Sequence, residues 1–360
     1  MKLFSCQCCQ QALYFENTTC ESCHHPVGYL PGLSVLTALE PMGHGRWHPM
    51  EPQVRNAELV YCSNHEHDAC NWLTTPSQTG QPPICFACRF NRTIPNLKDP
   101  KNLERWRKIE VAKHRLFYTL IRLKLPIRSW REDPDNGLAF DFLDDAPDGS
   151  APVMTGHNNG LITLAIREAD DAERERMRVE MGEYYRTLLG HFRHEIGHYY
   201  WNVLVRDAGR LESCRAIFGD DSQDYQEALQ RHYNNPPPED WRERHVSSYA
   251  TSHPWEDFAE TWAHYLHIVS TLETAWAYGV TIHPGIPDAS TLSTDGPKND
   301  PYLTSTFDEI MDAWVPLTSA VNSLNRSMGL ADFYPFVLTA GVREKLAFIH
   351  ALIRETQALR

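Results

Sequence analysis

The chain has 360 residues, of which 42% are hydrophobic, and 34 Lys and Arg stand against 47 Asp and Glu. That length is enough for two domains, with a sizeable core in the larger one. The net charge of −13 argues against a general nucleic-acid-binding protein. No apolar run approaches the length of about 18 residues that is needed to cross a bilayer, so a membrane role is not expected either.

Cysteines dominate the amino-terminal quarter, where nine of the ten in the chain precede residue 89. Two Cys-x2-Cys pairs, ten residues apart, have the spacing of a zinc ribbon: Cys6 with Cys9, and Cys20 with Cys23. A second set of four thiols follows, made of Cys62, Cys70, Cys85 and Cys88. Beside these sets stand a spare thiol and four histidines that can each replace a thiolate: Cys8, His24, His25, His65 and His67.

We therefore predict a zinc-ribbon region over residues 1–95 that holds two structural zinc ions, each bound by four cysteines. A disulfide framework is the alternative, but Cys-x2-Cys pairs in a chain without a secretory leader favour metal, and with it a reducing cytoplasm as the compartment. Zinc would supply much of the folding energy that a segment poor in apolar residues lacks. The ribbon is either a structural staple or a module that also docks a protein partner.

A basic segment follows the cysteines: between Arg89 and Arg131 there are 13 Lys and Arg but only three acidic residues. Within it, residues 102–125 show the apolar period of an amphipathic helix that ends before Pro126. Its basic face can serve an acidic partner or an anionic substrate, or it can face acidic segments of the same fold, which we prefer. Short strands are then predicted at 127–130, 138–143 and 161–166, with turns at 133–137 and 146–149.

The next segment, from Asp171 to about Asp207, contains no proline and many good helix formers, so we predict one long helix. Its second half reads His194-Glu195-Ile196-Gly197-His198. Residues four apart share a helix face, so the two histidines can bind one zinc ion and Glu195 can reach a water on it. Gly197 costs about 1 kcal/mol of helix propensity relative to Ala, which indicates close approach of another backbone or of the metal. The alternative is a buried helix with two hydrogen-bonded histidines.

A stiff loop at 234–240 leads to a helix that starts at Pro254. On this otherwise apolar helix, a stripe of polar side chains would be costly to bury without cations: Glu256, Glu260, His264 and His267. We predict Glu256 as the third zinc ligand, with Glu260 accepting from the N–H of a ligand imidazole and His264 beside it. The alternatives are Glu260 or His264 as the ligand, or an exposed acidic strip without metal.

The carboxyl-terminal part is expected to cover the core. Residues 284–301 form a polar linker, and Thr306 and Glu309 have the spacing of a capping box that opens a helix to about Asn325. A last helix is predicted over 341–357. Cys214 stands apart from the other cysteines and is expected to be a buried small residue.

Four segments carry a resemblance to known proteins: Cys6–Cys23, Cys85–Pro95, Tyr185–Trp201 and Ser252–Leu266. His-Glu-x-Gly-His on one helix, followed by Glu-x-x-Ala-Glu on a later one, resembles the gluzincin group of zinc metallopeptidases. Over nearly its full length, the chain resembles a bacterial family of zinc-binding metallopeptidases with an N-terminal zinc ribbon. The resemblance implies an α+β protein in which the ribbon precedes a mostly helical, gluzincin-like catalytic domain with a small β-sheet, over residues 96–360.

These residues predict peptide-bond hydrolysis, with one catalytic zinc ion besides the two structural ones. Zinc would lower the pKa of its bound water to about 7, and Glu195 would act as the general base and return the proton to the leaving amine. The developing oxyanion needs a further donor, for which Tyr249 is the candidate and His253 the competitor. The expected partner is a peptide or protein substrate.

Two other functions would use the same residues. A non-catalytic scaffold would hold three structural zinc ions and mediate protein association through the ribbon, with His264 or His253 as a fourth ligand at the histidine site. Hydrolysis of an amide that is not a peptide would need the same groups as a peptidase. Glu195 favours the two hydrolytic functions over the scaffold, because a structural zinc site needs no carboxylate between its histidines.

Overall fold

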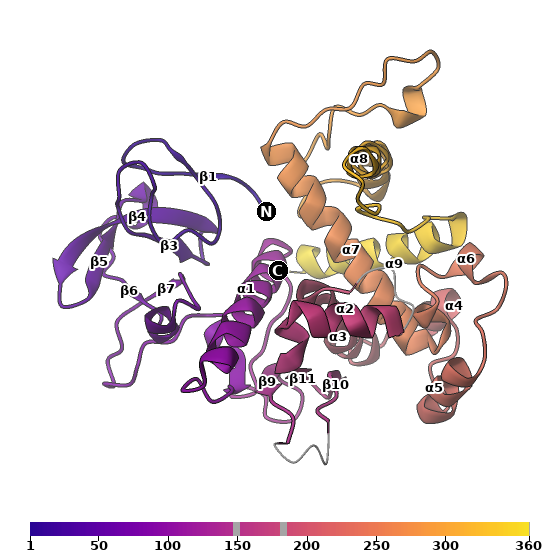
Figure 1. Cartoon of the computed structure of the whole chain (residues 1–360), viewed down its shortest axis with the longest axis horizontal. Helices are drawn as coiled ribbons and strands as arrows, with labels where there is room; N and C mark the ends of the chain where they lie inside the picture. Colours follow the sequence, from indigo (N-terminus) through magenta and orange to yellow (C-terminus); the bar gives the residue numbers. More distant parts are fainter. Residues whose placement is uncertain (147–151, 181–185, 360) are drawn as a thin grey trace. The chain divides into compact units, whose positions relative to one another are not determined.

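The computed structural model describes residues 1–146, 152–180 and 186–359 (Figure 1). It divides into two compact units, Lys2–Phe192 and Arg193–Arg360, with Met1 grouped with the second. Among the residues that the structure describes, the strands all lie in the first unit, and the second unit is helical. The predicted α+β class is confirmed.

The amino-terminal part of the first unit is built from short antiparallel strands. Two pairs of two-residue strands, β1 (Phe4–Ser5) with β2 (Ala12–Leu13) and β6 (Val60–Tyr61) with β7 (Leu73–Thr74), flank a sheet of β3 (Val27–Leu30), β4 (Val35–Gly43) and β5 (Arg46–Pro49). Aromatic rings fill its small core, where Tyr29 lies 4.8 Å, between ring centroids, from both Phe15 and Trp72. Isolated strand pairs of this length are marginally stable, so this part depends on other sources of stability.

Helix α1 (Pro100–Arg122) follows, and its side chains at Trp106, Ile109, Leu116 and Leu120 are fully buried. Asp99 caps it by accepting from the Lys101 N–H, and Leu123 closes it three residues before Pro126. A four-stranded sheet comes next, in the order β10 (Gly156–Asn158), β11 (Leu161–Ala165), β9 (Ala139–Leu143) and β8 (Asn91–Thr93). The strand predicted at 127–130 is wrong: only Ser129 forms a bridge there, with Leu138. The predicted turn at 146–149 lies largely outside the described residues.

The single long helix predicted from Asp171 is also wrong. The structure has α2 (Asp171–Glu180) and α3 (Leu188–Trp201), and Arg186 and Thr187 between them are not helical. The Thr187 hydroxyl accepts from the Gly190 N–H at 2.9 Å, so α3 has a start of its own. After Trp201 the chain continues as a π-helical turn, Asn202–Arg206. Tyr185, part of one segment that carries the family resemblance, lies outside the described residues.

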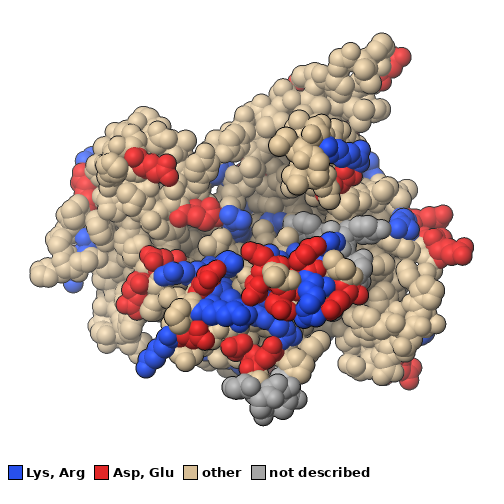
Figure 2. Space-filling view, viewed as in Figure 1, with Lys and Arg blue, Asp and Glu red and all other residues tan. Residues whose placement is uncertain are grey.

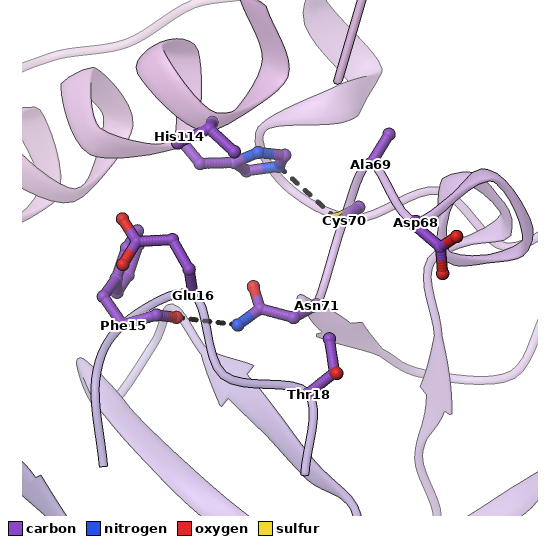
Figure 3. A pocket seen from close by; sticks show the side chains of 9 residues that line it. Phe15, Glu16, Thr18, Asp68, Ala69, Cys70, Asn71 and His114 are labelled. Atoms are coloured by element: carbon purple, nitrogen blue, oxygen red, sulfur yellow. Dashed lines mark hydrogen bonds between the residues drawn. The ribbon is translucent and has the colours of Figure 1, made fainter. Parts of the chain in front are cut away.

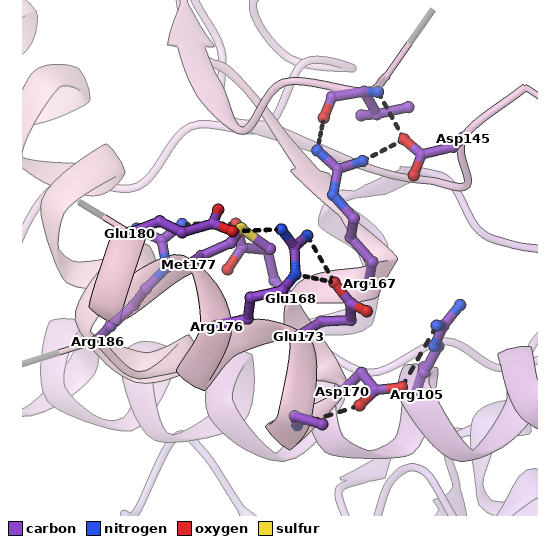
Figure 4. A network of polar contacts seen from close by, with 12 residues as sticks. Arg105, Asp145, Arg167, Glu168, Asp170, Glu173, Arg176, Met177, Glu180 and Arg186 are labelled. Carbon is purple, nitrogen blue, oxygen red and sulfur yellow. Dashed lines mark hydrogen bonds and ion pairs between the residues drawn. The ribbon is translucent and has the colours of Figure 1, made fainter. Parts of the chain in front are cut away.

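Opposite charges alternate over α2 and the neighbouring face of α1 (Figure 2). Asp170 lies 3.6 Å from a guanidinium nitrogen of Arg105, and Asp171 lies 3.5 Å from the Lys108 ammonium. Figure 4 shows Arg176 of α2 between Glu173 and Glu180, at 2.9 and 2.8 Å. The basic segment thus faces acidic groups of its own unit, which is the interpretation that we preferred from the sequence.

The second unit contains α4 (Leu211–Phe218), α5 (Tyr225–Asn234), α6 (Trp241–Arg244), α7 (Pro254–Ala277), α8 (Phe307–Ser327) and α9 (Ala340–Ala358). Helix α7 is its centre, contacted by α4, α8 and α9. The predicted capping box is confirmed at α8, where Thr306 and Glu309 bond each other's backbone N–H at 3.2 and 2.8 Å. None of the helices in the described residues has a stretch long and apolar enough to pass through a bilayer.

Candidate metal centre

Helices α3 and α7 come close together at Gly197. A Cβ atom added to Gly197 would lie 2.9 Å from the Ala259 Cα and 3.2 Å from the Ala259 carbonyl oxygen. Any larger side chain would therefore push the two backbones apart. The close approach expected from the glycine is confirmed, and the partner is the backbone of α7. It brings the histidines of α3 next to the carboxylates of α7.

Three side chains converge at this crossing. The Glu256 Oε2 lies 2.9 Å from the His194 Nε2 and 3.4 Å from the His198 Nε2. One potential ligand atom from each residue lies within 4.8 Å of the other two, and Glu256 and His198 are buried. Two imidazole nitrogens and one carboxylate oxygen form the donor set of a catalytic zinc site, which keeps a fourth position open for water or substrate. The residues present therefore fit a zinc ion.

Glu256 is ionised in this environment. Burial would by itself raise the pKa of its carboxyl group, but the adjacent His198 and His194 outweigh burial and hold the pKa well below its ordinary value. Its second oxygen is also bound: the Tyr225 hydroxyl, from α5, donates to Oε1 at 2.6 Å. Sequence reasoning missed Tyr225, because no spacing or motif connects it to Glu256. The ring of Trp255 lies against the ring of His198, with centroids 3.8 Å apart and planes inclined by 35°.

Glu260 lies on the far side of His194. Its Oε1 is 2.8 Å from the His194 Nδ1, and its Oε2 accepts from the Ser247 hydroxyl at 2.6 Å. A carboxylate at Nδ1 makes that nitrogen the N–H donor and leaves Nε2 free of hydrogen for a metal. This is the arrangement predicted for Glu256 and Glu260, although the ligand roles themselves stay predictions.

Glu195 lies one residue along α3 and is only 9% exposed. Burial raises the pKa of its carboxyl group, against the opposing effect of His194 and His198. Within the described part of the chain, no side chain hydrogen-bonds to this carboxylate, so its oxygens remain available to a water or a substrate.

The other three predicted residues lie around this centre. Tyr249 is in a 3-10 turn (Tyr249–Thr251), and its ring centroid is 5.9 Å from that of His194. His253 is engaged with the backbone on both nitrogens: Nδ1 accepts from the Trp255 N–H at 3.1 Å, and Nε2 lies 3.2 Å from the Gln223 carbonyl oxygen. His264 hydrogen-bonds through Nδ1 with the Tyr334 hydroxyl at 2.8 Å. Neither His253 nor His264 belongs to the converging set described above.

Both predicted sets of cysteines also come together. The potential ligand atoms lie within 4.8 Å of one another in the group of Cys6, Cys9, Cys20 and Cys23, and likewise in the group of Cys62, Cys70, Cys85 and Cys88. The second group is entirely buried. Cys8 lies near Cys23 and His25 on the exposed side of the first group, and Cys214 is buried within α4, as expected.

Two family models match the chain, one over each part. Residues 102–352 match a family model described as "Putative zinc-binding metallo-peptidase", and residues 3–99 match a zinc-ribbon domain. Uncharacterized proteins of Mycobacterium tuberculosis and Mycobacterium bovis are 43% identical to the chain over 356 residues, which is 99% of this chain and 96% of theirs. No solved structure matches it. The chain therefore belongs to this family of zinc-binding metallo-peptidases and carries the zinc ribbon at its amino-terminal end.

Proposed function

We propose that the chain is a zinc-dependent metallopeptidase whose centre is formed by His194, His198 and Glu256. One observation carries the proposal: the two imidazoles and the buried carboxylate converge on one point, while the neighbouring Glu195 keeps its carboxylate without a side-chain partner among the described residues. A structural zinc site has no use for a buried carboxylate of this kind beside its ligands.

Each residue then has a separate task. Zinc, when bound, would polarise the substrate carbonyl and lower the pKa of a water molecule to about 7. Glu195 takes a proton from the attacking water and passes it to the leaving amine nitrogen. Burial raises the pKa of the Glu195 carboxyl group, which favours its taking up the proton. Glu260 fixes the ring of His194, and Tyr249 is our candidate for the hydrogen-bond donor to the oxyanion.

In this proposal, the ribbon holds two structural zinc ions. The ribbon can also dock a protein partner. Its eight thiolates are best kept in a reducing compartment, so we place the protein in the cytoplasm. The substrate is a peptide or protein, bound at the crossing of α3 and α7.

The test is Glu195→Gln in the full chain, with Glu212→Gln, an exposed residue of α4, as the control. Both variants should fold and hold about three zinc ions per chain by elemental analysis, like the wild type. Hydrolysis of a peptide library, followed by mass spectrometry, should fall by about 10²- to 10⁴-fold in Glu195→Gln alone. Undiminished cleavage in Glu195→Gln would refute the general-base role. A zinc-loaded wild type that cleaves no peptide would favour the scaffold.

A further inference from the structure

The second cysteine group (Cys62, Cys70, Cys85 and Cys88) is contacted by a side chain outside the ribbon. His114, on α1, places its Nε2 3.4 Å from the Cys70 Sγ and 3.6 Å from the Cys88 Sγ. The ring packs on Trp72, with centroids 5.1 Å apart, and is buried. His114 lies inside the residues that match the metallo-peptidase model, whereas all four cysteines lie inside the zinc-ribbon match.

The four sulfur atoms differ in their hydrogen-bond donors. Backbone N–H groups reach three of them at 3.4 Å each: Trp72 N–H to Cys70, Cys85 N–H to Cys62, and Cys88 N–H to Cys85. For the Cys88 Sγ, the nitrogen within reach among the described residues is the His114 Nε2. Four buried thiolates around one divalent ion leave two negative charges in a dry interior, so each sulfur without a donor is costly.

Cys88 also lies next to a carboxylate. The Glu110 Oε2 lies 3.5 Å from its sulfur, and Glu110 is fully buried. The charge of Glu110 is matched by the buried ammonium of Lys113, 2.7 Å from Oε1, and by a hydrogen bond from the Asn91 side chain at 2.9 Å. Lys113 is therefore committed to Glu110, and the imidazole N–H of His114 is left to stabilise the thiolate.

A small pocket that opens to solvent reaches the same edge of the group (Figure 3). Cys70, Asn71 and His114 line it, and Figure 3 shows the His114 ring turned toward Cys70. Glu16, at the pocket, forms an ion pair with Arg115 at 2.7 Å. The imidazole and Cys70 thus both lie at the place where a small molecule can approach the cysteine group.

We propose that His114 is a positioning residue of the second zinc site. Its Nε2–H donates to the thiolates of Cys70 and Cys88, lowers the charge on the sulfur that faces Glu110, and shields the edge of the site that the pocket exposes. The four buried sulfur atoms, all within 4.8 Å, fit a tetrahedral zinc ion without His114 as a ligand. The proposal is independent of peptidase activity.

The experiment uses the full chain loaded with cadmium, which gives separate NMR resonances for four-thiolate sites and for a site of imidazoles and a carboxylate. We compare the wild type with His114→Leu, which removes the donor, and His114→Gln, which keeps an N–H. Metal transfer to a chelator should be about 10- to 100-fold faster in His114→Leu, at the second site only, with His114→Gln in between. His25→Leu, beside the first group, is the matched control and should leave the second site unchanged.

Two results would overturn the proposal. One is a rate of metal transfer from the second site that is the same in all three proteins. The other is a direct scalar coupling between cadmium and the His114 Nε2 in the wild type, which would make the imidazole a ligand instead of a donor. Because the coupling is measured on the wild type, the proposal stays testable even if His114→Leu fails to fold.

Discussion

At the scale of single residues, the candidate centre is organised around the two nitrogens of His194. Glu256 and Glu260 are four residues apart on α7, so both face α3, and the imidazole ring lies between them at 2.9 and 2.8 Å. One carboxylate therefore shares the Nε2 side with His198, and the other can only hold the ring. The same spacing that makes the two glutamates look equivalent in the sequence gives them different positions.

Tyr225 should affect the metal without touching it. Its hydroxyl donates to the Glu256 Oε1, so Tyr225→Phe frees that oxygen and loosens the carboxylate. We expect zinc affinity at the histidine site to fall by about 10- to 100-fold with little change in fold. Tyr233→Phe, an exposed tyrosine on the same helix, is the control. Competition with a chelator measures the affinity, and equal values for the two variants would show that the hydroxyl is not needed.

At the scale of secondary structure, the crossing of α3 and α7 depends on Gly197. An alanine there gains about 1 kcal/mol of helix propensity but introduces a methyl group 2.9 Å from the Ala259 Cα, and overpacking of this kind costs about 1–3 kcal/mol. We therefore expect Gly197→Ala to lower the melting temperature and to weaken zinc binding at His194 and His198.

Gly285→Ala is the matched control, since a Cβ atom there meets nothing within 4 Å. Thermal unfolding and zinc content of both variants measure the effect. A Gly197→Ala protein that is as stable as Gly285→Ala and fully loaded with zinc would show that the helices separate at no cost.

Helix positions were predicted best from the sequence where a segment shows both the apolar repeat of an amphipathic helix and a residue typical of a helix start. The capping box at Thr306 and Glu309 and the proline at the start of α7 locate two helix starts correctly. The break before α3 was missed because Thr187 looks like any residue in a run of helix formers, and its role depends on a single hydrogen bond to Gly190. Strands of two residues, such as β1 and β6, are too short to show the alternation of apolar and polar residues by which a strand is predicted.

At the scale of the whole molecule, acid should destabilise the second unit through buried histidines. Burial, assisted by the positive charge of Arg354, lowers the pKa of His350 to about 4, whereas a histidine in the unfolded chain titrates near 6.5. The folded protein thus binds fewer protons than the unfolded chain between these values. The stability contributed by neutral His350 is fully present above pH 6.5 and is lost as the pH falls toward 4.

His350→Gln removes this titration and keeps a polar group next to the Tyr265 hydroxyl, which lies 2.9 Å from the His350 Nδ1. Urea unfolding of both proteins between pH 7 and pH 4 should show a smaller loss of stability in the variant. The difference in slope should approach about 1.4 kcal/mol per pH unit, the value for one proton. Parallel curves would mean that the pKa of His350 is the same in the folded protein and in the unfolded chain. Metal loss in acid affects both proteins alike and cancels in the comparison.

The sequence placed the boundary between ribbon and catalytic domain near residue 95, and this division stays a prediction. The two family matches meet between residues 99 and 102, while the compact units meet between Phe192 and Arg193. Cysteine spacing revealed both thiol groups. It could not reveal His114, which reaches the second group only after folding, and no spacing connects Tyr225 to Glu256.

The position of His114 has a consequence for how such chains can be recombined. If the ribbon were exchanged between relatives at the junction near residue 100, the four thiolates of its second cysteine group would meet an α1 helix from a different protein. A fragment that starts at Pro100 would expose Glu110 and Lys113, both fully buried in the intact chain, on the face that Cys88 and Asn91 cover. The exchangeable piece is therefore larger than the ribbon and includes α1.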